Sequence, residues 1–235
     1  MKFPTDLIEG RLVKRYKRFF ADVELADGAV VTAHCANTGA MTGIKTPGLP
    51  VWLSRSDNPK RKLKYTWELV EAEGTLIGAL PNLANALAEE AVTAGVISEL
   101  SGYDSLRREV KYGENSRIDL LLEGNDRPAC WVEVKNVHWQ RGPGIAEFPD
   151  GVTSRGAKHL VELANQVKAG ERAVQLFIVQ RSDCEVLRPA EDIDPVYAET
   201  LRTSAAAGVE VLAYACDVSP TAVTITRPMR VELNP

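Results

Sequence analysis

The segment CWVEVKNV (residues 130–137) decides the fold, because it is an apolar run that carries two charges. Its cysteine, tryptophan and valines predict a buried strand, which Glu133 and Lys135 interrupt two residues apart. Side chains at i and i+2 of a strand point to the same side, so this carboxylate and this ammonium project together. A charge in a dry interior is costly, and the pair therefore needs partners or solvent.

A second acid interrupts the preceding apolar segment RIDLLL (residues 117–122), where Asp119 lies between Ile118 and Leu120. If the two strands pair through a turn near Gly124-Asn125, Asp119 and Glu133 converge. Converging carboxylates repel each other, and a divalent cation relieves that repulsion. Hard oxygen ligands suit Mg²⁺ or Mn²⁺, so these two acids are the predicted metal ligands.

Lys135 completes a predicted catalytic set with Asp119 and Glu133. Beside a metal, its ammonium would orient the attacking water or stabilise a charged transition state. The set is the one that metal-dependent phosphodiester hydrolysis requires. The same residues also allow a structural reading, in which Glu133 pairs with Lys135, or Asp119 pairs with an arginine.

A helix is predicted over residues 153–168, with Thr153 or Ser154 as its N-cap and Gly170 as its terminator. A β–α connection would aim its first turn at the carboxyl end of the strand that carries Glu133. Free backbone N–H groups there favour phosphate, which makes Arg155 and Lys158 candidate phosphate contacts. His159 is expected to be a structural hydrogen-bonder. Asp150 is expected to reach the site or to stabilise its own turn.

The fold class follows from a change, near residue 80, in the secondary structure that the sequence predicts. Short predicted strands fill the first part, which favours a small barrel; they cover residues 7–13, 19–25, 29–35, 51–54, 64–73 and 75–77. Helices and strands alternate afterwards, with a Gly/Pro-rich loop at 140–151. The helices are predicted near 83–94, 153–168 and 195–207, and the strands at 106–112, 117–122, 130–137, 173–179 and 209–215. We therefore expect a mixed α/β protein: an OB-like small β-barrel over 1–80, and an α/β domain with a central mixed sheet over 81–235.

Basic residues and aromatics are interleaved in the first part of the chain. KRYKRF (14–19) has four cations and two aromatics, and residues 55–64 are also rich in Lys and Arg. Such stretches track a sugar–phosphate backbone and stack bases, whereas the bland alternative is a solvated surface. Nothing in them indicates readout of a defined base sequence. The predicted DNA contacts here are Lys14, Arg15, Tyr16, Lys17, Arg18, Arg55, Lys60, Arg61 and Lys62.

The composition argues against a disordered chain, a zinc or disulfide framework and a membrane protein. With 235 residues, 45% hydrophobic and 26% charged, the chain can build a packed core. The formal net charge of −4 hides a basic excess over residues 1–80. The four cysteines form no C-x-x-C pair and are expected to be buried thiols. No apolar targeting or membrane segment is evident, so we expect a cytoplasmic protein with no membrane partner.

Four stretches together resemble the bacterial sugar fermentation stimulation protein A (SfsA) family: AHCANTGAM (33–41), SRIDLLL (116–122), VEVKNV (132–137) and FPDGVTSRGAKHLVEL (148–163). The resemblance spans nearly the whole chain. It implies an OB-type barrel joined to a restriction-endonuclease-like PD-(D/E)xK domain, DNA binding, and a regulatory link to sugar (maltose) metabolism. It also implies that the metal-binding acids fall on Asp119 and Glu133 and the lysine on Lys135. The extra upstream acid of that superfamily would be Glu99 or Glu109.

Two hypotheses remain. The first is an Mg²⁺- or Mn²⁺-dependent deoxyribonuclease of the PD-(D/E)xK type, with the barrel holding DNA. The second is a non-catalytic, sequence-nonspecific DNA-binding regulator that keeps the acids as a structural site. Exposed strand edges also raise a homodimer as an expectation. A sugar- or nucleotide-metabolising enzyme finds no support, because no dinucleotide-binding, Walker or triad motif is present.

Overall fold

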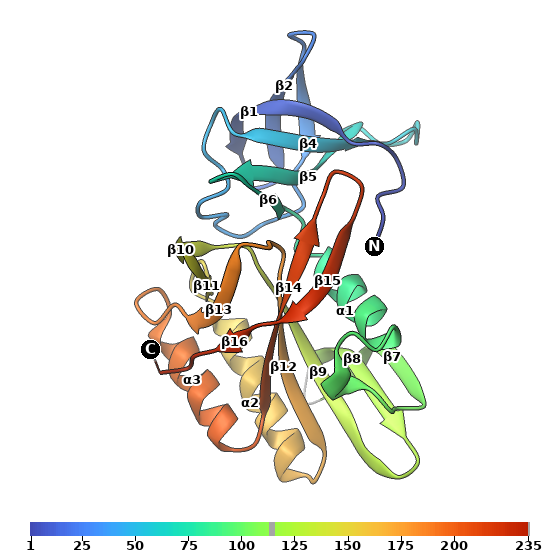
Figure 1. The fold of residues 1–235 in the computed structure, drawn as a ribbon, viewed down its shortest axis with the longest axis vertical. Coiled ribbons are helices and arrows are strands. Elements are labelled where there is room, and N and C mark those ends of the chain that lie inside the picture. Colours follow the sequence, from blue (N-terminus) through green and yellow to red (C-terminus); the bar gives the residue numbers. More distant parts are fainter. Residues whose placement is uncertain (113–115, 235) are drawn as a thin grey trace.

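The computed structural model describes residues 1–112 and 116–234, which form a β-barrel followed by a mixed α/β domain (Figure 1). This confirms the predicted fold class. The turn predicted at Gly113-Glu114-Asn115 lies outside the described residues. None of the helices in the described part of the chain is long and apolar enough to cross a membrane.

The barrel closes because its third and fifth strands pair in parallel. Its strands are ordered β3-β2-β1-β4-β5-β6; they are β1 (Ile8–Tyr16), β2 (Phe20–Leu25), β3 (Val30–His34), β4 (Pro50–Arg55), β5 (Tyr65–Ala72) and β6 (Thr75–Gly78). Leu12, Val23 and Trp67 belong to its buried core. At Gly10 a Cβ would lie 2.5 Å from a methyl of Val23, so only glycine permits this close packing of β1 on β2.

The second domain is built on a six-stranded mixed sheet ordered β15-β14-β12-β9-β8-β7. β9 and β14 run parallel to the central β12, while the outer pairs are antiparallel. The strands are β7 (Ser105–Tyr112), β8 (Ser116–Gly124), β9 (Arg127–Val137), β12 (Arg172–Val179), β14 (Glu210–Val218) and β15 (Val223–Pro228).

Helices cover both faces of this sheet (Figure 1). α1 (Leu83–Thr93) packs on the face that includes Val132 and Val134, and the short η1 (Ser98–Leu100) follows it. α2 (Ser154–Lys168) and α3 (Pro195–Ala206) pack on the face that includes Val137. Alternation along β9 therefore turns its odd-numbered side chains towards α2. Thr153 is the N-cap of α2, as predicted, and its Oγ1 accepts the Gly156 N–H at 3.2 Å.

The prediction of an irregular loop over residues 140–151 is wrong. The segment contains β10 (Gln140–Gly142) and β11 (Gly144–Phe148), which join β13 (Cys184–Pro189) and β16 (Arg230–Val231) in a four-stranded sheet. The reason is tertiary: β11 pairs in parallel with β13, about forty residues further along the chain. Local Gly and Pro signals do not report such a distant pairing. All four cysteines are free and buried, as expected.

Candidate active site

Asp119 lies where β8 and β9 stop pairing. The described ladder between these strands runs from Gly124↔Arg127 to Leu120↔Val132, which confirms the predicted hairpin. The Asp119 Oδ2 atom accepts the backbone N–H of Val134 at 2.7 Å. Its Oδ1 atom accepts the Asn85 side-chain amide of α1, also at 2.7 Å. The carboxylate thus takes the place of a backbone carbonyl as the acceptor for Val134, and each of its two oxygens accepts one hydrogen bond.

Glu133 projects from β9 towards α2 and is only 2% exposed. Its Oε1 atom is bonded to both the Lys135 ammonium and the His159 Nδ1 atom. Lys135 therefore lies on the same side as Glu133, as the i, i+2 spacing predicts, and its side chain is 16% exposed to solvent. Glu133 and Lys135 are thus in direct contact, and Asp119 lies close enough for the charges of both to shift its pKa.

The proton on His159 can be assigned from its second contact. The Arg155 Nε–H donates to His159 Nε2 at 3.2 Å, one turn earlier on α2. A guanidinium has no acceptor, so Nε2 must be the unprotonated nitrogen. Nδ1 then carries the proton and donates it to Glu133. A carboxylate oriented by the donor nitrogen of a histidine is a common supporting arrangement in metal sites.

The two carboxylates influence each other electrostatically. Burial, together with the negative charge of Glu133, raises the pKa of Asp119 to about 6. Burial acts to raise the pKa of Glu133 too, but the His159 hydrogen bond and the Lys135 charge bring it below its ordinary value. Burial and the nearby charge of Glu133 thus disfavour the ionised form of Asp119, and a bound cation would favour that form.

One carboxylate oxygen of the site is buried without a partner. Among the described residues, Glu133 Oε2 has no hydrogen-bond partner, whereas the nearby Tyr112 hydroxyl interacts with the Glu162 carboxylate. Burial and the charges of Glu133 and Glu162 raise the pKa of Tyr112, so this hydroxyl lies within their field. A buried carboxylate oxygen without a partner is costly, and a divalent cation is a ligand that would satisfy it.

No group of three or more His, Cys, Asp or Glu side chains in the described part of the chain is arranged to hold a metal ion. Mg²⁺, however, usually keeps several waters and takes one or two carboxylates from the protein. Asp119 and Glu133 Oε2 are the two carboxylate groups that would be available to such an ion. The residues present therefore fit a hydrated hard cation rather than a fully protein-coordinated one.

The two candidates for an upstream acid differ in position. Glu99 on η1 accepts the Tyr214 hydroxyl at 2.6 Å, on the face covered by α1. Glu109 lies on β7 between the pairs Arg108↔Leu120 and Val110↔Ile118, which places it opposite Asp119. Its backbone has a φ of 53°, and its side chain is exposed. No described contact joins either acid to Asp119 or Glu133.

Three supporting residues were missed or undervalued by the sequence reasoning. Gln175 on β12 donates to the Glu133 carbonyl at 3.0 Å, and it is a polar residue in an apolar strand, the signal that identified Glu133. His159 was expected only to form structural hydrogen bonds. Asn85 lies on α1, and no sequence pattern connects it with Asp119.

The two phosphate contacts predicted on α2 differ in how strongly the protein itself engages them. Arg155 donates to His159, as described above. The Lys158 ammonium lies 3.7 Å from a carboxylate oxygen of Glu162, and its side chain is 53% exposed. Lys158 therefore remains open to a ligand, whereas Arg155 is part of the support of Glu133.

The basic hairpin at residues 14–19 is more ordered than a loose cationic patch. Arg15 donates to the backbone carbonyls of Asn37 and Gly39, at 2.8 and 3.1 Å. Lys14 lies 3.5 Å from the Asp22 carboxylate, and the Tyr16 hydroxyl donates to the same residue. Tyr16 also stacks on Phe20. Lys17 and Arg18 form the turn between β1 and β2 and are exposed.

The second basic stretch belongs to the connection between β4 and β5. Arg55, Lys60 and Lys62 lie at the surface, and Arg61 donates to Thr66 Oγ1 at 2.9 Å. In Figure 1 this connection and the turn between β1 and β2 lie on opposite sides of the barrel. The predicted DNA-contacting residues thus form two separate surfaces rather than one stripe.

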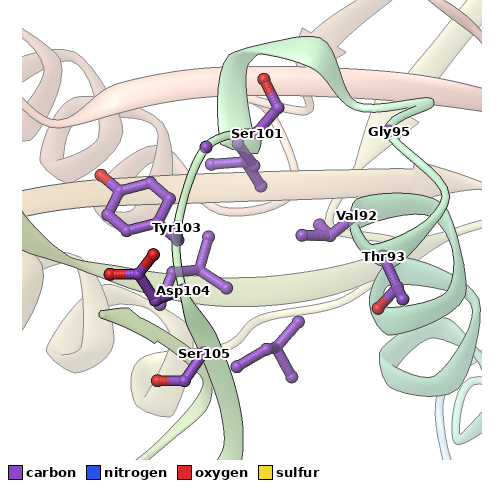
Figure 2. Close-up of a pocket in the computed structure, with 11 residues that line it drawn as sticks. Val92, Thr93, Gly95, Ser101, Tyr103, Asp104 and Ser105 are labelled. Atoms are coloured by element: carbon purple, nitrogen blue, oxygen red, sulfur yellow. The ribbon is translucent and has the colours of Figure 1, made fainter. Parts of the chain in front are cut away.

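A pocket of about 330 Å³ lies away from the carboxylates, between the end of α1 and the start of β7 (Figure 2). Figure 2 shows Val92 and Thr93 on one wall, and Tyr103, Asp104 and Ser105 on the other. None of the predicted catalytic or DNA-contacting residues lines it.

Comparison with known proteins gives consistent matches over both parts of the chain. Residues 13–79 match the family described as "SfsA N-terminal OB domain", and residues 82–222 match "Sugar fermentation stimulation protein RE domain". A "Sugar fermentation stimulation protein homolog" of Maricaulis maris is 94% identical over all of both chains. One of Paramagnetospirillum magneticum is 56% identical over 100% of this chain and 99% of its own.

A similar solved structure is described as "The structure of Pyrococcus Furiosus SfsA in complex with Ca2+". It superimposes with a TM-score of 0.88 at 26% sequence identity. The match covers 99% of this chain and 98% of that one.

Proposed function

The chain belongs to the sugar fermentation stimulation protein family, and from this premise and the site geometry we propose that it is a divalent-metal-dependent nuclease that hydrolyses phosphodiester bonds of DNA. One observation carries the proposal. Glu133 Oε2 is buried without a partner, in the same electrostatic field as Asp119, beside a partly exposed lysine. Two carboxylates where the pairing of β8 and β9 ends, beside a lysine that is partly exposed to solvent, suit phosphodiester hydrolysis.

Asp119 and Glu133 are the residues that would hold Mg²⁺ or Mn²⁺. When bound, the ion supplies positive charge next to the phosphate and so stabilises the negative charge that develops during hydrolysis. Asn85 and the Val134 N–H fix the Asp119 carboxylate, and His159 fixes that of Glu133. The site is thus supported by contacts that set the direction of each ligand.

Lys135 is assigned the role of positioning the reacting groups. Its ammonium has three donors, of which one is bonded to Glu133. The remaining donors can bind a phosphate oxygen or the attacking water, because the side chain is partly exposed. The greater exposure of its side chain supports Lys135 rather than Glu133 as the group that contacts substrate in this proposal.

The barrel supplies the DNA-binding surface in this proposal. OB-folds commonly bind oligonucleotides through one face and its loops, and this barrel bears exposed Lys and Arg at the turns of residues 17–18 and 55–62. The related Pyrococcus furiosus protein, whose structure is described as a complex with Ca²⁺, supports a hard-cation site on this fold. Binding without strong sequence preference is expected, since backbone contacts carry no base information.

Purified protein incubated with plasmid and with single-stranded DNA tests this proposal. We expect cleavage with Mn²⁺ or Mg²⁺, none with EDTA, and loss of cleavage in Glu133→Gln while DNA binding in EDTA persists. Cleavage that continues in EDTA, or that survives in Glu133→Gln, would contradict the assigned site.

A second function, a non-catalytic DNA-binding regulator linked to sugar (maltose) metabolism, is favoured by one observation. Glu133 Oε1 is already bonded to Lys135 and His159, so the charges of these three residues balance internally. In that case the wild-type protein binds DNA equally well with and without metal, and cuts neither plasmid nor single strand under any condition.

A further inference from the structure

A cleft of about 520 Å³ lies where the barrel meets the α/β domain. The barrel side consists of the β1–β2 turn and residues 38–45. The other side is the segment 148–153 that leads into α2. The cleft contains none of the residues of the carboxylate site, so it is a separate feature of the surface.

Three cations line the barrel side, and they differ in what they bind. Arg15 builds the wall, because its guanidinium donates to the carbonyls of Asn37 and Gly39. Lys45 donates to the Ala40 carbonyl at 2.6 Å, which leaves two of its N–H groups free. The exposed Arg18 guanidinium has no hydrogen-bond or salt-bridge partner among the described residues. Arg18 and Lys45 are therefore the cations that can bind a ligand.

The carboxylate of the cleft does not balance these cations. Asp150 lies 3.4 Å from His138 Nε2 and accepts the Thr42 N–H at 3.5 Å. It thus fastens the β11–α2 connection to the end of β9 and to the barrel. No described contact joins Asp150 to Arg18 or Lys45, and the three cations of the cleft outnumber its one carboxylate.

The turn that presents Arg18 has an unusual backbone. Lys17 and Arg18 have φ values of 48° and 63°. Met41 belongs to the segment 38–45 on the same side of the cleft and has a φ of 53°. Residues other than glycine seldom adopt this left-handed region, and such residues concentrate at binding sites. The unusual backbone here places the free guanidinium at the rim of the cleft.

α2 connects the cleft with the carboxylate site. Thr153 lines the cleft, and His159, six residues later, is bonded to Glu133. At about 1.5 Å per residue this is about 9 Å of helix axis. A strand a few nucleotides long is therefore long enough to extend from the cleft to the partly exposed Lys135, which is bonded to Glu133. Val152, which is 79% exposed, offers an apolar surface beside the cations.

We propose that this cleft binds a phosphate group of a single-stranded nucleic acid, with Arg18 and Lys45 as the phosphate contacts and Val152 against the adjoining sugar or base. The proposal rests on the proposed function in taking DNA as the substrate, and it deepens it by naming a single strand. A cavity of this volume suits one nucleotide rather than a length of duplex.

The test is binding of a fluorescent single-stranded oligonucleotide by the full-length protein in EDTA, measured by anisotropy over a salt series. The double variant Arg18→Ala/Lys45→Ala is expected to bind about tenfold or more weakly. The slope of log K against log salt should become shallower by about 0.7, which is the contribution of one phosphate contact on a single strand. Duplex of the same length should be affected less.

A charge-matched control removes two exposed cations far from the cleft, Lys2→Ala/Lys168→Ala, and should behave as wild type. A second variant, Val152→Asp, keeps every hydrogen bond of the cleft and adds a negative charge to an exposed position. It should weaken binding like the double variant, which guards against a folding defect in the latter.

The inference is overturned if the cleft variants and the control lose the same affinity, if Val152→Asp binds as wild type, or if wild type binds no single strand in EDTA. Because EDTA excludes cleavage, the two proposals fail separately. If the cleft variants lose binding and the wild-type protein never cleaves DNA, the cleft proposal is supported and the nuclease proposal fails. If the wild-type protein cleaves DNA with metal and the cleft variants bind as wild type does, the nuclease proposal is supported and the cleft proposal fails.

Discussion

The buried carboxylate site and the basic hairpin of the barrel differ in what determines the role of each charged residue. In the carboxylate site it is the position of the residue on its strand, and in the hairpin it is the contacts with neighbouring loops. On β9, Glu133 is almost fully buried and Lys135 lies beside it, because a strand sets the side of every residue. In the hairpin, Arg15 is fixed by carbonyls of a distant loop, while the Arg18 side chain has no partner among the residues that the structure describes. A buried charge must find a partner, whereas a surface charge takes whatever role the neighbouring loops leave to it.

The largest expected effect is on the metal-binding carboxylates. Asp119→Asn and Glu133→Gln keep the shape of each side chain but remove its charge. Metal-dependent cleavage should fall by about 10²–10³-fold, the range for losing one electrostatic group of an active site. Rates of plasmid nicking in Mn²⁺ measure this loss. DNA binding in EDTA serves as the control and should not change; a parallel loss of binding would point to misfolding.

Lys135→Met tests whether Lys135 contacts the substrate and is not needed to bind the metal ion. Cleavage should drop by about 10²-fold, because a donor to the phosphate or water is lost. Mn²⁺ affinity should be kept or rise, because Glu133 loses a competing cation. Isothermal titration with Mn²⁺ checks this, and a loss of metal binding together with activity would contradict the assigned role.

His159 tests whether support of Glu133 depends on a particular nitrogen. His159→Ala should weaken Mn²⁺ binding by about 10–100-fold, as is usual for residues that orient a ligand. Asn places an N–H close to the position of Nδ1, so His159→Asn should restore much of the affinity. Gln places its N–H nearer to that of Nε2, so His159→Gln should not. Equal loss in all three variants would mean that His159 acts only through packing.

Arg15 and Arg18 of the hairpin are expected to contribute differently to the free energy of unfolding of the protein. Arg15→Ala removes donors from the Asn37 and Gly39 carbonyls and should lower the free energy of unfolding by about 1–2 kcal/mol. Arg18→Ala should change it by less than about 0.5 kcal/mol, because the side chain is exposed. Urea denaturation of the two single variants makes the comparison. Equal destabilisation would remove the distinction between wall and ligand contact.

The smallest effect is expected at the second basic surface. The double variant Lys60→Ala/Lys62→Ala changes the connection between β4 and β5. In Figure 1 this connection lies on the opposite side of the barrel from the turn between β1 and β2. If DNA contacts both surfaces, the salt slope of binding falls slightly in this variant too. If only the hairpin side binds, the slope matches that of wild type. Anisotropy over a salt series distinguishes the two, and it decides whether the predicted contacts at residues 55–62 stand.

Sequence reasoning reached the mixed α/β fold, the barrel and the shared side of Glu133 and Lys135, because these depend on local period and on a short hairpin. It could not find Asn85, whose helix meets β8 only through packing of the sheet. It also missed β10 and β11, which exist because β13 lies beside them. Gln175 carried the same signal as Glu133 and could have been predicted.

The central claim is that Asp119 and Glu133 together hold a divalent cation. A crystal structure of the protein soaked in Mn²⁺, with anomalous scattering recorded at the manganese edge, tests it most directly. The account predicts an anomalous peak between the Asp119 carboxylate and Glu133 Oε2, absent in Glu133→Gln. Saturating Mn²⁺ with no peak there, and Glu133 still bonded to Lys135 and His159, would contradict it.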